Sequence, residues 1–179
     1  GTYQASTGQS SCSDADAGYY VANSASTSQT ACSTGSFQPS TGQISCLDAD
    51  SGNYVSTIGS ASQYACSTGT YQPYSGQSSC LDADAGYYTD TTASVSQTAC
   101  AAGTYQPSTG QTSCIDASAG YYVDTTAAIS QTACTAGTYN ANTGSTSSSA
   151  CLDADAGYYV PSTGSASQTA CAAGTYQPS

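Results

Sequence analysis

The chain has 179 residues and a formal net charge of −11, which comes from eleven aspartates because Lys, Arg, His and Glu are absent. With no cationic side chain, a phosphate clamp or basic groove cannot form, so the composition excludes nucleic-acid binding and attraction to an anionic membrane surface. No apolar run approaches the roughly 20 residues that span a bilayer. Leu, Ile, Val and Phe make up about 7% of the chain, far below the roughly 20% under which chains tend to stay disordered.

Ten cysteines compensate for this small apolar content. Burial at about 25 cal/mol per Å² cannot by itself offset the backbone entropy of so polar a chain. Regularly spaced cysteines in a chain with a small core predict disulfides and an oxidising, extracellular or cell-surface setting. A cytosolic metal protein is the alternative, but cysteine metal sites usually contain C-x-x-C pairs, and the chain has none.

A phrase that opens with glycine recurs along the chain at steps of 34 residues, with one final step of 37. This period predicts a tandem array in which each unit contacts mainly its neighbours. The chain starts at Gly1 within the phrase, so we expect processing or truncation to have removed any leader. The predicted boundaries are 1–34, 35–68, 69–102, 103–136 and 137–173, the last with a three-residue insertion within residues 140–150, and residues 174–179 begin a sixth repeat.

Each repeat divides into two similar halves of 17 residues, such as AGTYQPSTGQTSCIDAS at residues 102–118 and AGYYVDTTAAISQTACT at residues 119–135. Both halves start with Ala-Gly-x-Tyr, pass a Ser/Thr/Gly-rich bend and end in a polar, strand-like run. This pattern predicts short, irregular β-hairpins, and no apolar period of 3.6 residues indicates a helix. The predicted fold class is therefore small disulfide-rich repeats, forming an elongated rod of β-hairpins with no helix and no globular core.

The half-repeat pattern C-x-x-G-T-Y-x-x-x-x-G-x-x-x-C, as in residues 100–114, resembles the ephrin-receptor-like cysteine-rich repeat, a relative of the tumour necrosis factor receptor module. In that family successive units meet at C-x-x-C, and each disulfide closes one unit around Gly-Thr-Tyr. Here the second cysteine of each junction is an alanine, and the expected partner fourteen residues later is a glutamine. The substituted positions are Ala15, Ala49, Ala83, Ala117 and Ala154, with Gln29, Gln63, Gln97, Gln131 and Gln168.

Because both ends of the same loop are lost together, the resemblance implies that the retained cysteines pair across each Gly-Thr-Tyr unit. The implied pairs are Cys32–Cys46, Cys66–Cys80, Cys100–Cys114 and Cys134–Cys151. Each loop of about 15 residues then contributes roughly 3 kcal/mol in the chain-entropy model.

That pairing leaves Cys12 and Cys171 to bond beyond the segment, either in a longer array or with Cys171 of one copy bonded to Cys12 of the next. An alternative scheme closes every cysteine internally. Its pairs are Cys12–Cys32, Cys46–Cys66, Cys80–Cys100, Cys114–Cys134 and Cys151–Cys171.

Paired aspartates are a candidate calcium site, since Asp-x-Asp-x-Gly resembles the opening of a calcium loop. The candidate ligands are Asp14, Asp16, Asp48, Asp50, Asp82, Asp84, Asp153 and Asp155. Calcium requires six to eight oxygens, so carbonyls or another chain would have to complete the shell. The alternative is a solvated turn whose charges aid solubility.

Ser and Thr make up about a third of the residues, and such a composition is typical of O-glycosylated stalks. Six hydroxyl residues, in pairs that each follow a proline, are the candidate acceptors: Ser40, Thr41, Ser108, Thr109, Ser162 and Thr163. Sixteen tyrosines fall at matching places in the half-repeats, which predicts aromatic stacking between successive units. A carbohydrate-binding aromatic strip is the alternative for these tyrosines.

An enzyme is not expected, because His, Lys, Arg and Glu are missing and the cysteines are committed to bridges. Two functions remain. The first is a structural segment of a surface fibril, filament or stalk, carrying O-glycans and joined to copies of itself or to a continuing chain. The second is the ligand-binding stalk or ectodomain of a receptor or adhesin.

Overall fold

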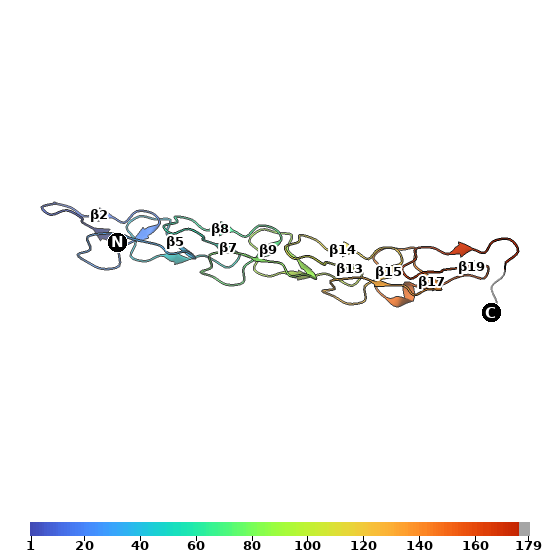
Figure 1. The fold of residues 1–179 in the computed structure, drawn as a ribbon. Coiled ribbons are helices and arrows are strands. Elements are labelled where there is room, and N and C mark those ends of the chain that lie inside the picture. Colours follow the sequence, from blue (N-terminus) through green and yellow to red (C-terminus); the bar gives the residue numbers. More distant parts are fainter. Residues whose placement is uncertain (176–179) are drawn as a thin grey trace. The chain divides into compact units, whose positions relative to one another are not determined.

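Ten antiparallel two-stranded hairpins make up the fold of this computed structural model, which describes residues 1–175 (Figure 1). The hairpins are β1 (Thr2–Tyr3) with β2 (Ser13–Asp14), β3 (Tyr19–Tyr20) with β4 (Thr30–Ala31), β5 (Ser36–Phe37) with β6 (Leu47–Asp48), β7 (Asn53–Tyr54) with β8 (Tyr64–Ala65), β9 (Thr70–Tyr71) with β10 (Leu81–Asp82), β11 (Tyr87–Tyr88) with β12 (Thr98–Ala99), β13 (Thr104–Tyr105) with β14 (Ile115–Asp116), β15 (Tyr121–Tyr122) with β16 (Thr132–Ala133), β17 (Thr138–Tyr139) with β18 (Leu152–Asp153), and β19 (Tyr158–Tyr159) with β20 (Thr169–Ala170). The prediction of short hairpin repeats is confirmed.

The hairpins follow the two kinds of half-repeat, which differ at their twelfth residue. A cysteine half-repeat begins at Gly1, Gly35, Gly69, Gly103 or Gly137 and carries a cysteine there, shifted by the insertion in the last case. A glutamine half-repeat begins at Gly18, Gly52, Gly86, Gly120 or Gly157 and carries a glutamine there. In both kinds the arms pair in one register, as in Thr2↔Asp14 and Tyr19↔Ala31.

Helical structure in residues 1–175 is limited to η1 (Ser148–Ala150), a three-residue 3-10 turn inside the insertion. None of the described helical segments is long and apolar enough to cross a membrane. The chain forms two compact units, Gly1–Asp82 with Thr89–Gln97, and Ala83–Tyr88 with Thr98–Ser179. The predicted sixth repeat lies outside the described residues from residue 176 onwards.

Backbone hydrogen bonds connect the half-repeats within each unit. The opening glycine donates its N–H to a carbonyl of the next half-repeat, as in Gly18 to Gln38 at 2.7 Å and Gly120 to Asn140 at 2.7 Å. The residue at the loop tip donates back to a carbonyl two half-repeats earlier, as in Gly42 to Ala15 at 2.8 Å. Each half-repeat is therefore hydrogen-bonded to the next half-repeat and to the one after that. These bonds satisfy backbone N–H and carbonyl groups that the short, two-stranded hairpins of residues 1–175 leave unpaired.

Close backbone contact explains why a glycine opens each phrase. Gly35 has a φ of +83°, and a Cβ on it would overlap the carbonyl oxygen of Gly76, two half-repeats along. Only glycine combines the left-handed backbone with so close an approach. Repeat packing is therefore limited by main-chain contact rather than by large side chains.

Within each unit the buried side chains form a small core that recurs from one half-repeat to the next. Two positions of the half-repeat supply most of it, namely Ala15, Cys32, Ala49, Cys66, Ala83, Cys100, Ala117 and Cys134 at the fifteenth, and Val21, Gln38, Val55, Gln72, Thr89, Gln106, Val123, Asn140 and Val160 at the fourth. The buried Gln38 amide remains satisfied, since Nε2 donates to Ser45 O at 2.8 Å and Oε1 accepts from Ser40 N–H at 3.2 Å. A buried amide without such partners would be costly.

Candidate functional site

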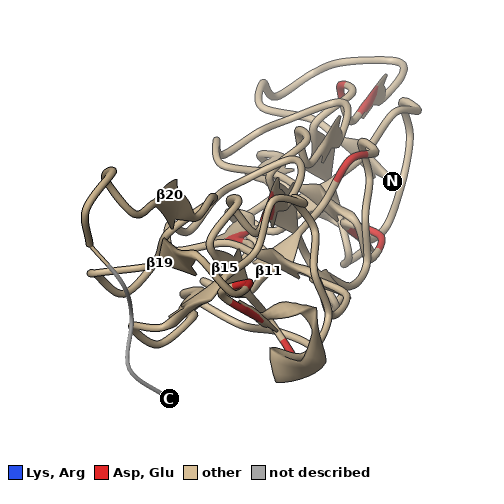
Figure 2. Ribbon diagram, turned by 90° about the vertical axis from the view of Figure 1, so that its right-hand side faces the viewer, with Lys and Arg blue, Asp and Glu red and all other residues tan. Residues whose placement is uncertain are grey.

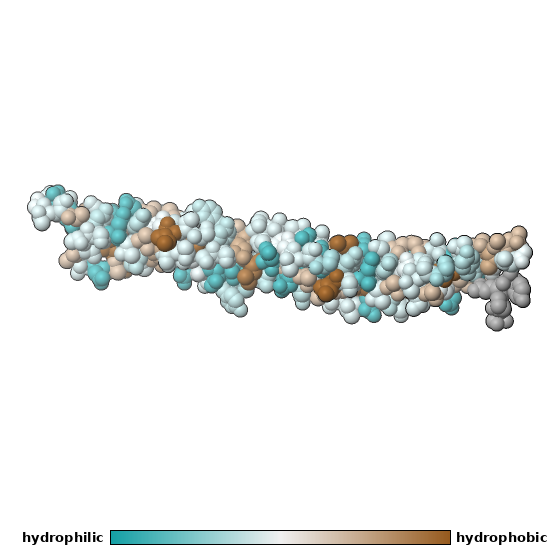
Figure 3. Space-filling view, in the orientation of Figure 1, coloured by the Kyte–Doolittle hydropathy of each residue, from teal (hydrophilic) through white to brown (hydrophobic). Residues whose placement is uncertain are grey.

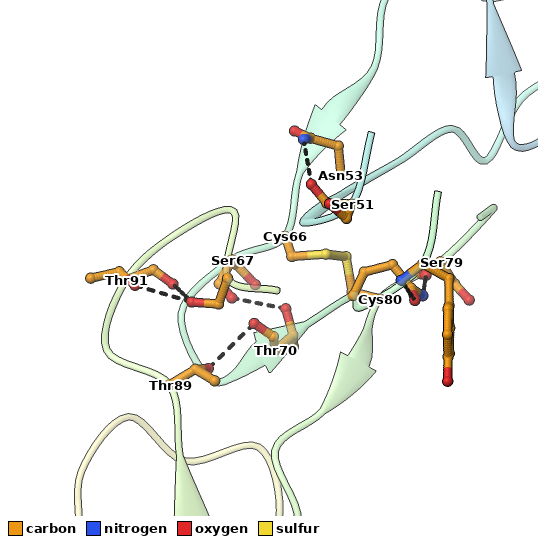
Figure 4. The surroundings of a disulfide bond; sticks show 12 residues. Ser51, Asn53, Cys66, Ser67, Thr70, Ser79, Cys80, Thr89 and Thr91 are labelled. Atoms are coloured by element: carbon orange, nitrogen blue, oxygen red, sulfur yellow. Dashed lines mark hydrogen bonds between the residues drawn. A yellow bond between two sulfur atoms is a disulfide. The ribbon is translucent and has the colours of Figure 1, made fainter. Parts of the chain in front are cut away.

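The junctions between half-repeats hold most of the residues singled out from the sequence. Four disulfides each connect the fifteenth residue of a glutamine half-repeat to the cysteine of the following half-repeat, and Figure 4 shows one of them, Cys66–Cys80. The bonds are Cys32–Cys46, Cys66–Cys80, Cys100–Cys114 and Cys134–Cys151, with Cα–Cα distances between 5.6 and 5.8 Å. The family resemblance implies the same pairs, and these bonds exclude the scheme that begins with Cys12–Cys32.

Each disulfide also belongs to a wider contact that includes a third half-repeat. The carbonyl of Cys32 accepts the N–H of Gly59 at 2.8 Å, and that of Cys66 accepts the N–H of Ala93 at 2.8 Å. Cys100 and Cys134 accept from Ala127 and Gly164 in the same way. A buried cysteine therefore bonds covalently to the next half-repeat and through its carbonyl to the one after, which we call the disulfide junction.

The other kind of junction replaces the disulfide by hydrogen bonds. Ala15 is fully buried where a cysteine would sit. Gln29, at the other end of the lost loop, accepts the N–H of Asp16 through Oε1 at 2.7 Å and donates from Nε2 to the Asp16 carboxylate at 2.7 Å. Gln63 with Asp50, and Gln168 with Asp155, make the same pair of bonds. We call this arrangement the amide junction.

One amide junction is weaker, because the fourth repeat has a serine in place of the aspartate. Gln131 Oε1 still accepts the N–H of Ser118 at 2.6 Å, but its Nε2 lies 3.4 Å from the Ser118 hydroxyl. The missing carboxylate removes the charge-assisted bond, the stronger of the two kinds. The repeats thus contain a natural comparison for the role of the aspartate.

These amide bonds give Asp16, Asp50 and Asp155, the second aspartates of their Asp-Ala-Asp pairs, a structural partner that the sequence did not indicate. No group of three or more Cys, His, Asp or Glu side chains that could hold a metal ion occurs within residues 1–175. Asp16, Asp50 and Asp155 direct a carboxylate oxygen to a glutamine amide, while Asp14 and Asp48 lie beside the tips at Gly42 and Gly76. Calcium binding stays an untested hypothesis, and Figure 2 shows the acidic residues spread along the ribbon.

The six candidate glycosylation residues are all exposed at hairpin tips. No side-chain hydrogen bond within residues 1–175 involves the hydroxyls of Ser40, Thr41, Ser108 or Thr109, whereas the Ser162 hydroxyl lies 3.3 Å from that of Ser165. The tips of the cysteine half-repeats therefore offer the more accessible hydroxyls.

The prediction that tyrosines stack between successive units is wrong for the tyrosines that the structure describes. Their one close ring pair, Tyr54 and Tyr64 at 6.0 Å between centroids, lies within a single hairpin. Other tyrosines contact the tip of the half-repeat two positions along, as Tyr19 does at Gly59 and Tyr121 at Gly164. A half-buried tyrosine ring that packs on a glycine bend needs no aromatic partner. The recurring positions of the tyrosines therefore reflect this ring-to-bend contact and not ring stacking.

Together, the hairpins and the disulfide junctions define a small disulfide-rich repeat protein. A family model described as tyrosine-protein kinase ephrin type A/B receptor-like matches residues 52–100 and 98–134. Residues 52–134 are therefore similar to ephrin-receptor-like cysteine-rich repeats, a non-catalytic, extracellular type of domain. Among curated proteins, none matches the chain.

Proposed function

We propose that the chain is a structural segment of an extracellular fibril, filament or stalk that carries O-glycans. The observation that supports this most strongly is the uniformity of the junctions. Within each unit the same hydrogen bonds recur from one half-repeat to the next, so that further half-repeats can be added without any new kind of contact. Such an array has nearest-neighbour energetics that suit a spacer of variable length.

The surface supports the same function. The exposed large apolar residues, including Ile44, Ile58 and Tyr74, are distributed over different half-repeats. On the face drawn in Figure 3 the hydrophobic residues form small, separate groups on a pale, mostly hydrophilic surface. Large contiguous apolar patches are the usual mark of a protein-binding site, so this face favours a scaffold.

Measuring length against repeat number tests the structural role. Duplicating residues 69–102 adds one repeat and keeps the phase of the cysteines. We expect each added repeat to lengthen the particle by a constant increment in small-angle scattering and electron microscopy. A particle whose maximum dimension does not grow with added repeats would contradict the proposal.

Two measurements on the native, unreduced material complete the test. Electron micrographs are expected to show long, uniform fibrils, and the intact mass is expected to exceed that of the bare chain by multiples of a sugar residue. Replacing Thr41 and Thr109 by Ala should remove part of that excess, whereas replacing the engaged Ser162 should remove less. A mass equal to that of the bare chain would eliminate the glycans but not the scaffold.

The family match supports a second candidate, the stalk or ectodomain of a receptor or adhesin, because the matching family model is receptor-like. In that case the candidate ligand-binding segment is the insertion around η1, because this loop differs in length from the other hairpin loops of residues 1–175. Short projections from a larger protein in the same micrographs would favour this candidate over the fibril.

A further inference from the structure

One hairpin of the chain carries two tyrosines directly opposite each other. In β7 and β8, Tyr54 and Tyr64 are register partners, and their ring centroids lie 6.0 Å apart with an angle of 42° between the ring planes. Among the tyrosines of residues 1–175 they form the one close ring pair. Directly opposed side chains are the closest cross-strand neighbours in an antiparallel pair. The strand register therefore fixes this pair in place.

The tyrosine at position 64 departs from the repeat. In every other glutamine half-repeat the corresponding residue of the second strand is a threonine, which faces the recurring tyrosine of the first strand. These hairpins supply natural controls that have one ring and lack the other. Their register pairs are Tyr20↔Thr30, Tyr88↔Thr98, Tyr122↔Thr132 and Tyr159↔Thr169.

The hairpin that contains the two rings has no covalent closure of its own. It belongs to a glutamine half-repeat, and Gln63 holds its loop through hydrogen bonds to Asp50. The nearby Cys66 is bonded to Cys80 of the following half-repeat, so this disulfide does not connect the two strands of the hairpin. A bond between Tyr54 and Tyr64 would close a loop that the disulfides leave open.

Both rings are accessible and have room to turn. Tyr64 is 52% exposed. Tyr54 is half-buried and lines an open cavity of about 330 Å³ together with Ser56, Ala65 and Cys80. A carbon–carbon bond between the rings requires them to move closer together. The exposure of Tyr64 and the cavity beside Tyr54 allow that movement without a change in the strands.

The composition directs one-electron oxidation to tyrosine. Trp, Met and His, which are other oxidisable side chains, are absent from the chain. Cys66 and Cys80 are already oxidised to a disulfide, so no thiol of theirs competes. A radical on either ring of the pair has the other ring as its nearest aromatic neighbour. Two reactants held side by side combine at a much higher effective concentration than two that must meet in solution.

We propose that Tyr54 and Tyr64 are a modification site at which oxidative coupling forms an intramolecular dityrosine bond. The oxidant is hydrogen peroxide, used by an extracellular haem peroxidase. Each phenol loses its hydroxyl hydrogen atom, and the two phenoxyl radicals join through ring carbons ortho to the oxygens. The ortho hydrogens then move to the oxygens, which restores both phenols. One hydrogen peroxide accepts two hydrogen atoms and gives two waters, so atoms and electrons balance.

The dityrosine bond would close the hairpin covalently at an amide junction. It restricts the unfolded chain as a disulfide does, but a reducing agent does not cleave it. The site goes beyond the proposed function, because it concerns a single hairpin and is the same whether the chain belongs to a fibril or to a receptor stalk.

Limited oxidation of the full chain tests the site. Any unpaired thiol is first alkylated, because a thiol reduces a phenoxyl radical. The dilute protein is then treated with a haem peroxidase and hydrogen peroxide, and its peptides are mapped by mass spectrometry. We expect a product in which Tyr54 and Tyr64 are joined with the loss of two hydrogens, together with the blue fluorescence of dityrosine.

Three variants provide matched controls. Tyr64→Thr restores the residue of the other hairpins and should lower the yield of intramolecular dityrosine on the order of ten-fold. Tyr74→Ser removes a tyrosine that is 69% exposed but has no ring opposite it, and should leave the Tyr54–Tyr64 bond unchanged. Thr98→Tyr places a second ring opposite Tyr88 and should add a second joined pair.

Several results would overturn the proposal. One is an equal yield of intramolecular dityrosine in the Tyr64→Thr variant, and another is a parent chain that forms dityrosine only between separate molecules. A Thr98→Tyr variant with an unchanged circular dichroism spectrum and no second joined pair would also contradict it, because the register would then not direct coupling. None of these results affects the proposed structural function, which the increment of length per repeat tests independently.

Discussion

The disulfide junction and the amide junction occupy equivalent places in alternating half-repeats, yet they hold those places by different means. At Cys66–Cys80 a covalent bond closes the loop. At Ala49 and Gln63 the loop is open, and Gln63 makes two hydrogen bonds to Asp50 instead, at 2.7 and 2.6 Å. The backbone bonds between half-repeats continue unchanged through both, with Gly76 donating to Ala49 as Ala93 donates to Cys66.

The backbone hydrogen bonds between half-repeats are the same at both junctions and therefore set the spacing of the half-repeats, whereas we expect the junction side chains to set the stability of the fold. In this chain an amide takes the place of a bridge at every second junction and satisfies the exposed end of the loop, as Gln63 does at Asp50. A disulfide acts chiefly by restricting the unfolded chain, whereas a surface hydrogen bond adds a net contribution of only about 0.5–1.5 kcal/mol. The two junctions should therefore differ clearly in their response to substitution.

The largest effect is expected from opening a disulfide junction. Replacing Cys66 and Cys80 together by Ala makes this junction resemble its neighbour at Ala49 and should lower the free energy of unfolding by about 3 kcal/mol, measured by urea unfolding. C12S is the control, because Cys12 is exposed and unbonded. An unfolding midpoint equal to that of the parent would show that the disulfide adds no stability beyond that of the backbone hydrogen bonds between half-repeats.

The next effect tests the backbone contact that both junctions share. Gly35→Ala forces a Cβ against the Gly76 carbonyl, whereas Gly137→Ala meets open space at a similar φ, +89° against +83°. Both variants carry the strain of a left-handed residue, so the difference isolates the overlap, which should cost about 2 kcal/mol in thermal unfolding. Equal losses of stability in the two variants would mean that the backbone shifts to accommodate the Cβ at Gly35 with no measurable loss of free energy.

Converting an amide junction into a disulfide junction should raise the free energy of unfolding. Ala49→Cys with Gln63→Cys restores the pair that the family resemblance implies, and mass spectrometry would show the loss of two hydrogens on bond formation. The expected net increase in the free energy of unfolding is about 1–2 kcal/mol, because the new disulfide stabilises the fold by more than the two lost hydrogen bonds of Gln63 did. Ala49→Cys alone should not stabilise the chain. Failure of the double variant to oxidise would show that the two junctions are not equivalent in geometry.

The smallest effect concerns the aspartate of the amide junction. Gln63→Ala removes two hydrogen bonds and should lower the free energy of unfolding by about 1 kcal/mol. Gln131→Ala should cost less, because Ser118 offers a hydroxyl at 3.4 Å in place of the carboxylate. Hydrogen exchange of the Asp50 and Ser118 amides would compare the two sites, and equal changes would remove the special role of the carboxylate.

The period, the alternation of two half-repeats and the hairpin class could be predicted from the sequence, because these depend on local residue spacing and turn chemistry. The family resemblance, carried by the motif of residues 100–114, was sufficient to imply the four disulfide pairs. The composition, which lacks cationic side chains, predicts that the chain does not bind nucleic acid. The first residue of each hairpin could also be predicted, because the opening glycine recurs at the same place in every half-repeat.

The hydrogen bonds and side-chain contacts between half-repeats could not be predicted from the sequence. Gln29 binds Asp16, and Tyr19 covers the bend at Gly59, because backbone hydrogen bonds bring half-repeats together in one register. A backbone N–H and carbonyl are present in almost every residue, so residue types cannot indicate which ones pair.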